Sequence, residues 1–477
     1  MWKYFIYLYR LLIPVTWRDQ VKIIQRTLPS WIKKSKQLQM RDLERYYQSV
    51  LDQSSPLPAL KKPDLALAGL MDTFRKMQVR GELLGNAWWT DFLHAITLNN
   101  AEGSELQLRL QQGLANHSDT ALQYWEWLHL TKIALKFGLF DLAYWLRLKA
   151  RNSAISTLKK QDLNPAHPGF RTLLAAAAEA GEWDLFRANL NRLGFVAKNE
   201  KNAFLFLQRL ALKRLPNAHR NLPIFKVHAD NRFAEFTKNK RIAFVGPSKS
   251  LSKDAAEIDG YDLVVRCNYK EAGIGTDSDI KGLRCDISYF NNTQTRSICE
   301  SKPLQVPEVI KFAVFRAQTS LQKFRKAFLQ LDTCFAGQLI TRLSENYSLM
   351  LFEGSLNAIP NALCDLLRFD TDSIKIFHAD LMLTVDRFTG YTPGVENSAK
   401  HIDVFLKSCA GAHDPLTQYA LLKLMHSAKK ISGDPAFERV MQLGEASYMK
   451  ELQQIYGNFA RVGPFSGSCY QLITKSC

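Results

Sequence analysis

The residues with the clearest chemical potential follow a short apolar run. Gly246-Pro-Ser-Lys-Ser250 comes directly after Arg241-Ile-Ala-Phe-Val245. α/β proteins bind phosphate where a strand ends in small and polar residues before a helix-compatible segment, because small residues allow close approach and a helix N-terminus attracts anions. The loop is neither the P-loop pattern nor a Gly-x-Gly-x-x-Gly dinucleotide loop. It therefore predicts a phosphate site that neither of these motifs describes.

Apolar runs in the second half of the chain have the length of β-strands and are rich in branched and aromatic residues. Parallel strands need crossover connections, and the separation of the first three runs leaves room for them. The alternation of strands with a helix predicts a Rossmann-like α/β layer structure. The expected strands are 242–245, 263–265, 287–290, 309–315 and 374–377, and the expected helix is 356–369.

A longer pattern runs through the first part of this region. It reads Val245-Gly-x-Ser248, Leu251, Ile258-Asp259, Asp262-x-Val264-x-Arg266-x-Asn268, Gly275 and Asp279-x-x-Gly282-x-Arg284. This order resembles the large donor-binding motif of the eukaryotic-type sialyltransferase family, whose members transfer sialic acid from CMP-sialic acid. The resemblance covers roughly the last half of the chain, and only this motif matches at many positions.

The resemblance implies that several residues contact the CMP part of the donor. Ser248 and Asn268 match family positions that touch CMP, and Gly246 belongs to the same donor-binding loop. Arg266 and Arg284 match as well, although an arginine bonded to the backbone is as consistent with them as one that meets a carboxylate or phosphate. The loop also departs from the family, because it has Pro where the family has Asn after the first Gly.

A second family motif is a Ser-Thr-Gly type segment that opens a helix and leads to a strand. Its counterpart here is Gly354-Ser-Leu-Asn357. The order of helix and strand fits, but the residue types fit poorly. Ser355 and Asn357 are candidates to donate hydrogen bonds to the nucleotide, and a plain helix N-cap is an equal alternative for each.

The family's last motif is His, four residues, then Glu, and its histidine is taken to be the catalytic base. His413 stands at the histidine position, and Gln418 stands where Glu is expected. A histidine in a loop before a helix is accessible, and its ordinary pKa of about 6.5 suits removal of a hydroxyl proton. His413 is thus the catalytic candidate; a surface or capping histidine is the alternative.

Together these residues predict a glycosyltransferase that transfers a 2-keto sugar acid, sialic acid, from a CMP-sugar donor to a glycan or lipid-linked glycan. The expected reaction is inverting, with His413 removing the acceptor proton as the bond to CMP breaks through an oxocarbenium-like state. CMP leaves through a single phosphate, so hydrogen-bond donors and a helix N-terminus can stabilise it without a metal clamp. No metal and no cofactor besides the donor is expected.

Three alternatives stay open. CMP-Kdo, which carries another 2-keto sugar acid, is a similar donor. A metal-dependent transferase would use an Asp-x-Asp sequence, which occurs at Asp277-Ser-Asp279 and at Asp370-Thr-Asp372 but is a very common tripeptide. A catalytically inactive sialyltransferase-like domain would instead act as a binding module on a helical scaffold.

The first half of the chain has a helical pattern. Leu130, Ile133, Ala134 and Phe137 show the spacing of one buried helix face. Gly138-Leu-Phe-Asp-Leu-Ala and Gly181-Glu-Trp-Asp-Leu-Phe begin 43 residues apart, a period typical of helix-pair repeats. The predicted domains are a basic and aromatic segment at 1–40, an α-helical, repeat-like domain at 41–220, a sialyltransferase-like α/β domain at 240–440 and a C-terminal tail at 441–477, with residues 216–239 as the connection.

The charge of the chain favours anionic partners, because 63 Lys and Arg outnumber 45 Asp and Glu and give a net charge of +18. No Lys/Arg-rich recognition helix or RNA-binding signature accompanies this charge, so nucleic acid is not expected. The basic and aromatic residues of segment 1–40 favour peripheral contact with an anionic membrane; a helix packed on the protein is the alternative.

Targeting features point to the cytoplasm. The apolar run at the N-terminus is too short to span a bilayer and lacks a leader cleavage site. All eight cysteines lie at or after Cys267, without a Cys-x-x-Cys pair. Reduced thiols are expected, whereas animal members of the family carry a disulfide that links their motifs. We expect a cytoplasmic protein, peripheral at the inner membrane of a bacterium, in surface polysaccharide biosynthesis.

Overall fold

The computed structural model describes the part of the chain that carries the predicted site. All of its elements belong to one compact unit, Leu84–Tyr470. The basic and aromatic segment 1–40 and residues 461–477 lie outside the described residues. Those described are 88, 91–92, 95, 103–160, 164–165, 169–192, 204, 206–207, 228–269, 277–301, 306–316, 321–342, 347, 350–385, 405, 409 and 413–460.

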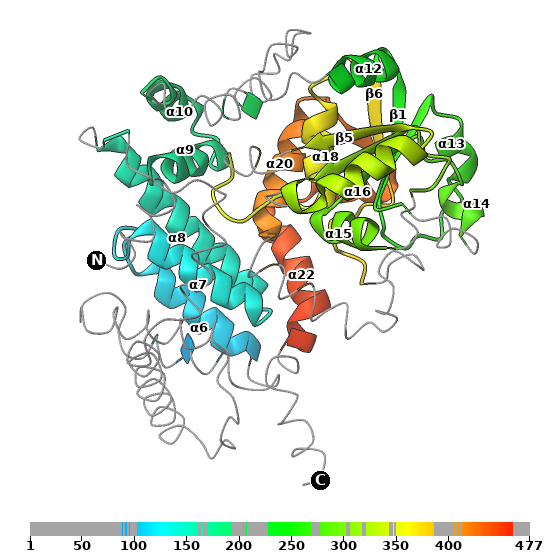
Figure 1. Ribbon diagram of the computed structural model, residues 1–477. Helices are drawn as coiled ribbons and strands as arrows, with labels where there is room; N and C mark the ends of the chain where they lie inside the picture. Colours follow the sequence, from blue (N-terminus) through cyan, green and yellow to red (C-terminus); the bar gives the residue numbers. More distant parts are fainter. Residues whose placement is uncertain are drawn as a thin grey trace, which may run out of the picture. The chain divides into compact units, whose positions relative to one another are not determined.

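A seven-stranded, all-parallel sheet with interleaved helices forms the α/β region of the described chain (Figure 1). Its strand order is β5-β4-β3-β2-β1-β6-β7. This confirms the Rossmann-like layer structure that the sequence predicts. The strands are β1 (Arg241–Val245), β2 (Leu263–Cys267), β3 (Ile287–Phe290), β4 (Phe312–Arg316), β5 (Gln338–Arg342), β6 (Ser373–Phe377) and β7 (Ser432–Gly433).

The predicted strands are confirmed with two corrections. β4 begins at Phe312 and not at Val309, because the chain turns there: Ile310 N–H donates to the Pro307 carbonyl at 3.1 Å. β5 and β7 are absent from the prediction. β5 has only two apolar residues among polar ones and β7 has only two residues, so neither forms an apolar run.

Helices cover both faces of the sheet, as parallel sheets require. Ala243 and Val245 on one face pack with Ile258 of α13 (Ala255–Asp259). On the other face, Tyr289 donates a hydrogen bond of 2.9 Å to Asp365 of α18 (Ala358–Leu366). The remaining helices of this region are α12 (His228–Thr237), α14 (Ser278–Lys281), α15 (Asn292–Glu300), α16 (Leu321–Cys334), α20 (Pro415–Ser427), α21 (Pro435–Gln442) and α22 (Glu445–Ala460).

The chain reverses its direction across the sheet between β1 and β6. β1 to β5 follow one another toward one edge, and the chain then returns to place β6 on the other side of β1. In open α/β sheets, ligands bind outside the carboxyl ends of the strands at this kind of switch point. The topology therefore predicts that a ligand binds at the loops after Val245 and Phe377.

The structure confirms a helical region, and the two similar sequences at Gly138 and Gly181 each form a turn between two helices. The described helices are α6 (Gly103–Ala115), α7 (Tyr124–Lys136), α8 (Phe140–Lys159), α9 (Phe170–Glu179) and α10 (Trp183–Leu190). Gly138 joins α7 to α8 with φ +69°, and Gly181 joins α9 to α10 with φ +75°. Both turns close with a backbone hydrogen bond of the same spacing, since Leu139 N–H bonds to Ala134 O and Glu182 N–H bonds to Ala177 O.

Two segments contain helices that the predicted organisation lacks. The connection 216–239 includes α12, and the predicted tail from residue 441 includes α22. α22 packs against α8 of the helical region. Within the residues that the structure describes, no helix is long and apolar enough to cross a membrane.

Candidate functional site

A cavity of about 110 Å³ lies at the switch point, lined by the loops that follow β1 and β6. Three of the predicted site residues, Ser248, Asn357 and His413, meet there, although they are far apart in the sequence. The full lining is Pro247, Ser248, Asn357, Ala358, Ile359, Pro360, Ala379, Leu381, Met382, Phe405, His413, Pro415, Gln418 and Tyr448.

The imidazole of His413 is held by the loop before α18. Its Nδ1 lies 3.0 Å from the carbonyl oxygen of Ser355 and 3.4 Å from the Ser355 hydroxyl. A carbonyl oxygen only accepts, so Nδ1 carries the proton and Nε2 is the basic nitrogen of the neutral ring. Burial lowers the pKa of His413, the Ser355 bond partly opposes this, and the charge of Arg316 lowers the pKa further. The ring is therefore neutral at pH 7.

Gln418 connects α20 to the same loop with both ends of its amide. Its Nε2 donates to the Ser355 carbonyl and its Oε1 accepts from the Asn357 N–H, each at 2.9 Å. His413 and Gln418 thus share one carbonyl as an anchor. The departure from the family's Glu does not cost the loop a contact here.

The amino end of α18 opens into the cavity. Asn357 is the N-cap residue by backbone geometry, but its side chain makes no capping hydrogen bond. The N–H groups of Ala358 and Ile359, both in the cavity lining, make no hydrogen bond within the described part of the chain. Unsatisfied N–H groups and the helix dipole together favour an anion at this position.

The loop after β1 is held against the end of β6. Ser248 donates its hydroxyl hydrogen to Asp380 at 2.6 Å, so this hydroxyl can only accept from a ligand while that bond lasts. Gly246 lies so close to β6 that an added Cβ would come within 2.4 Å of the His378 carbonyl oxygen. The close approach that Gly246 permits is therefore to the backbone of β6.

Asn268 lies at the carboxyl end of β2, outside the cavity lining, with φ +55°. Its Oδ1 accepts from the Asn291 N–H at 3.0 Å, which fixes the orientation of the amide. The Nδ2 amino group makes no hydrogen bond among the described residues. Asn268 therefore presents a fixed donor at the carboxyl edge of the sheet.

Arg266 and Arg284 do not reach the cavity, and they bond to the backbone. Arg266 donates to the carbonyl oxygens of Lys281, Gly282 and Arg284. Its register partner is Val245, so it lies on the sheet face that α13 covers, opposite α18. Arg284 donates to the carbonyl oxygens of residues 259, 261 and 262 and to Asp286. The backbone-bonded alternative is the one that the geometry supports for both.

Arg316 lies beside the cavity, outside its lining, and is not among the predicted site residues. It ends β4 on the face that α18 covers, and its Nη2 donates to the Leu356 carbonyl at 3.4 Å. The His413 ring bonds to the preceding residue, Ser355, so both side chains contact the same loop. A signal was present in the sequence, because Arg316 is the first charged residue after the predicted strand 309–315, at the edge where parallel strands bind ligands.

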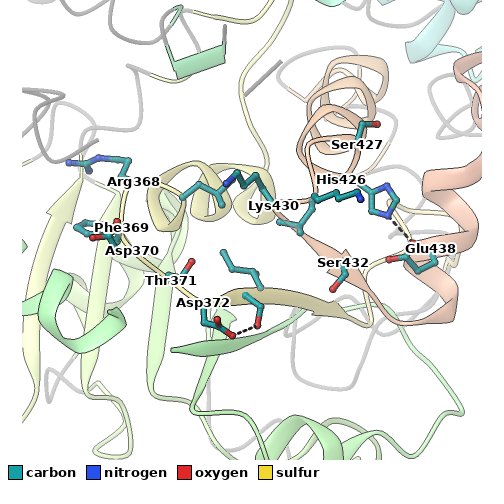
Figure 2. A pocket seen from close by; sticks show the side chains of 15 residues that line it. Arg368, Phe369, Asp370, Thr371, Asp372, His426, Ser427, Lys430, Ser432 and Glu438 are labelled. Carbon is teal, nitrogen blue, oxygen red and sulfur yellow. Dashed lines mark hydrogen bonds and ion pairs between the residues drawn. The ribbon is translucent and has the colours of Figure 1, made fainter. Parts of the chain in front are cut away.

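A larger cavity of about 750 Å³ lies at the opposite end of β6 (Figure 2). The Asp370-Thr-Asp372 sequence lines this cavity. It therefore lies just before β6, at the amino end of the strand. Figure 2 also shows His426 of this cavity paired with Glu438, at 2.8 Å. The other Asp-x-Asp sequence forms ion pairs with lysines: Asp277 pairs with Lys281, and Asp279 pairs with Lys253. Neither lies in the lining of the cavity that holds His413.

One group of side chains has the composition of a metal site. Donor atoms of Asp254, His378 and Asp434 lie within 4.8 Å of one another. However, Asp434 already accepts from the N–H groups of His378 and Phe437. His378 Nε2 also lies 3.3 Å from the Ile280 carbonyl, where it donates. These bonds connect the end of β6 to its neighbouring loops, which is a structural role for the group.

Comparison with protein-family models finds no match, and comparison with curated proteins finds none either.

Proposed function

We propose that this protein is a glycosyltransferase that moves a 2-keto sugar acid from a CMP-activated donor to a glycan or lipid-linked glycan. One observation carries the proposal: His413, Asn357 and Ser248 line a single cavity at the switch point of a parallel sheet. The motif resemblance assigns these same residues to the base and to donor binding. A shared site requires that residues 248, 357 and 413, which are far apart in the sequence, come together in the fold.

The contacts suit the proposed reaction. His413 Nε2 takes the proton of the acceptor hydroxyl, while Nδ1–H stays on the Ser355 carbonyl and stabilises the charged ring that forms. The N–H groups at the amino end of α18 stabilise the departing phosphate. The cavity volume of about 110 Å³ is below the range of about 300–1,000 Å³ typical of small-molecule sites, so it holds only part of a CMP-sugar.

The first test is substitution of the base. We expect His413→Ala to abolish transfer and to leave the affinity for CMP nearly unchanged, because the base contacts the acceptor and not the nucleotide. Release of CMP measures transfer, and calorimetry measures affinity. His426→Ala is the matched control, since His426 lines the other cavity and should keep full activity. Retained turnover in His413→Ala would refute the assignment.

The pH dependence gives a second test of His413. Only the unprotonated ring accepts a proton, and burial lowers its pKa below the ordinary value. We therefore expect kcat/KM to hold as the pH falls to about 6.5 and then to drop about tenfold per unit below the shifted pKa. An acidic limb centred above pH 7 would contradict this environment for the base.

Donor screening separates the remaining alternatives. CMP-sialic acid and CMP-Kdo are each incubated with and without candidate glycans, and CMP release identifies the donor. Transfer that survives excess EDTA removes the metal-dependent alternative. A protein that fails to bind CMP by calorimetry would support the binding module and would end the enzyme proposal. We place the reaction on the cytoplasmic side of a bacterial membrane, in surface polysaccharide biosynthesis, as part of the same proposal.

A further inference from the structure

Arg316 carries a buried charge that its described neighbours leave unbalanced. Its side chain is only 9% exposed. It forms no ion pair among the described residues, its Nε has no hydrogen-bond partner, and its one hydrogen bond, to Leu356, is long at 3.4 Å. Burying a charge without a partner is costly, so an arginine kept in this position indicates that an anion completes the site.

The other buried arginines of this protein show how the fold usually satisfies a guanidinium. Arg342 and Arg368 both pair with Asp365 at 2.9 Å. Arg147 pairs with Glu179 at 2.7 Å, and Arg266 donates to three backbone carbonyls. Among the described residues, Arg316 has no carboxylate partner and bonds to only one backbone carbonyl.

The described neighbours of Arg316 do not supply the missing negative charge. Cys267 lies on the same face of the sheet as Arg316, but burial raises the pKa of its thiol to about 12, so it is neutral at physiological pH. Leu356, which accepts the long bond, directly precedes the N-cap of α18. The free N–H groups of Ala358 and Ile359 follow in the first turn of that helix. A guanidinium and a helix amino end thus converge beside His413, and both favour an anion.

We propose that Arg316 and the amino end of α18 form an anion subsite that takes a phosphate or carboxylate group of the substrate. This identification of the ligand rests on the proposed function, because a CMP-linked sugar acid carries one phosphate and one carboxylate. The planar fork of arginine matches the paired oxygens of either group. Arg316 is then a binding residue that holds the donor next to the base.

Binding measurements with three ligands separate the two anionic groups. Arg316→Met and Arg316→Lys are compared with Lys253→Met, which removes a lysine that is 77% exposed. If Arg316 holds the phosphate, Arg316→Met weakens CMP binding at least tenfold and leaves cytidine binding unchanged. If it holds the carboxylate, CMP binding stays and the KM for CMP-sialic acid rises at least tenfold. Arg316→Lys should fall between, and Lys253→Met should match the wild type. Equal values for all three ligands in Arg316→Met and wild type would overturn the proposal.

A fourth probe keeps this test independent of the proposed function. Inorganic phosphate at millimolar concentration should raise the Tm of the wild type and leave that of Arg316→Met unchanged. If the wild type binds neither CMP nor CMP-sugars but keeps this response, the transferase proposal fails and the anion subsite stands. If phosphate raises neither Tm, or raises both equally, the subsite is refuted.

The stability of the free protein distinguishes a ligand-binding arginine from a structural one. Arg316→Met removes an unpaired buried charge, so the Tm without ligand should not fall. Arg342→Met leaves Asp365 with one fewer partner and should lower the Tm. An equal fall in both variants would show that Arg316 supports the fold, and this result would overturn the proposal.

Discussion

Gln418 illustrates how a single side chain sets the geometry of the cavity. It donates to the Ser355 carbonyl, which also anchors His413, and accepts from the N–H at the start of α18. A carboxylate at this position could accept from Asn357 but could not donate to Ser355. An amide is therefore the better fit to this loop, even though the resemblance leads one to expect Glu.

This contact predicts the effect of restoring the family residue. We expect Gln418→Glu to destabilise the fold by about 1–3 kcal/mol at neutral pH, because the half-buried Ser355 carbonyl loses a donor and faces a carboxylate. The loss should shrink at acidic pH, where a protonated Glu can donate. Urea unfolding at pH 7 and pH 5 measures both values. Gln442→Glu, on the exposed end of α21, is the control and should be neutral.

At the residue scale, only some of the predicted site residues line the cavity. Ser248, Asn357 and His413 meet as expected. Arg266 and Arg284 come from the same motif but bond to the backbone. Side chains alternate between the faces of a strand, so a motif position alone does not tell which face carries the ligand.

At the scale of elements, the junction of β1 and β6 fixes the floor of the cavity. Gly246 N–H donates to the Phe377 carbonyl at 2.7 Å, and Ser248 N–H donates to the His378 carbonyl at 2.9 Å. The two loops therefore extend the parallel pairing past the ends of the strands. Any side chain on Gly246 would separate them.

Substitution of this glycine tests the junction. Gly246→Ala places a Cβ within 2.4 Å of a backbone oxygen and within 2.8 Å of the Ala379 Cβ. We expect a loss of about 1–3 kcal/mol in the free energy of unfolding, since a backbone atom cannot yield as a flexible side chain does. Gly444→Ala is the matched control, because an added Cβ there meets nothing within 4 Å. Thermal or urea unfolding of both variants provides the comparison, and similar stabilities would contradict the junction described.

The elements that the sequence predicts well are those with strong local patterns. β1, β2, β3 and β6 are composed mostly of buried apolar residues, and the sequences that begin at Gly138 and Gly181 share Gly, Asp and Leu at the same positions. β5 is not predicted because it is an edge strand with a neighbouring strand on one side only, and its half-polar sequence does not form an apolar run. The site could be only partly predicted, since the sequence places Arg316 at the end of a strand but does not tell which face of the sheet its side chain lies on.

At the scale of the whole molecule, a buried ionic group links the helical and α/β regions. Arg147 of α8 pairs with Glu179 of α9 at 2.7 Å and with Asp414 at 3.4 Å, and donates to Thr417 at 2.7 Å. Asp414 directly follows His413 and caps α20. The helical region thus contacts the residue next to the proposed base.

This link predicts that a residue of the helical region affects catalysis. Arg147→Met leaves the buried Asp414 without its cation and leaves Glu179 with only Arg151, at 4.0 Å. We therefore expect a loss of about 3–5 kcal/mol in the free energy of unfolding and lower turnover. Arg439→Met, which breaks the exposed pair with Glu451, should cost less than about 1 kcal/mol and keep full activity. Urea unfolding and CMP release measure the two effects. An active, stable Arg147→Met protein would show that the link is dispensable.

The same ionic group constrains how this chain can be shortened or recombined. A fragment that begins at the predicted boundary would carry Asp414 and Thr417 without the guanidinium that they face. Grafting the α/β region onto a foreign scaffold would meet the same defect, because the new partner would have to supply a cation at one defined place. A shortened or recombined protein should therefore keep the helical region together with the loop that carries His413 and Asp414.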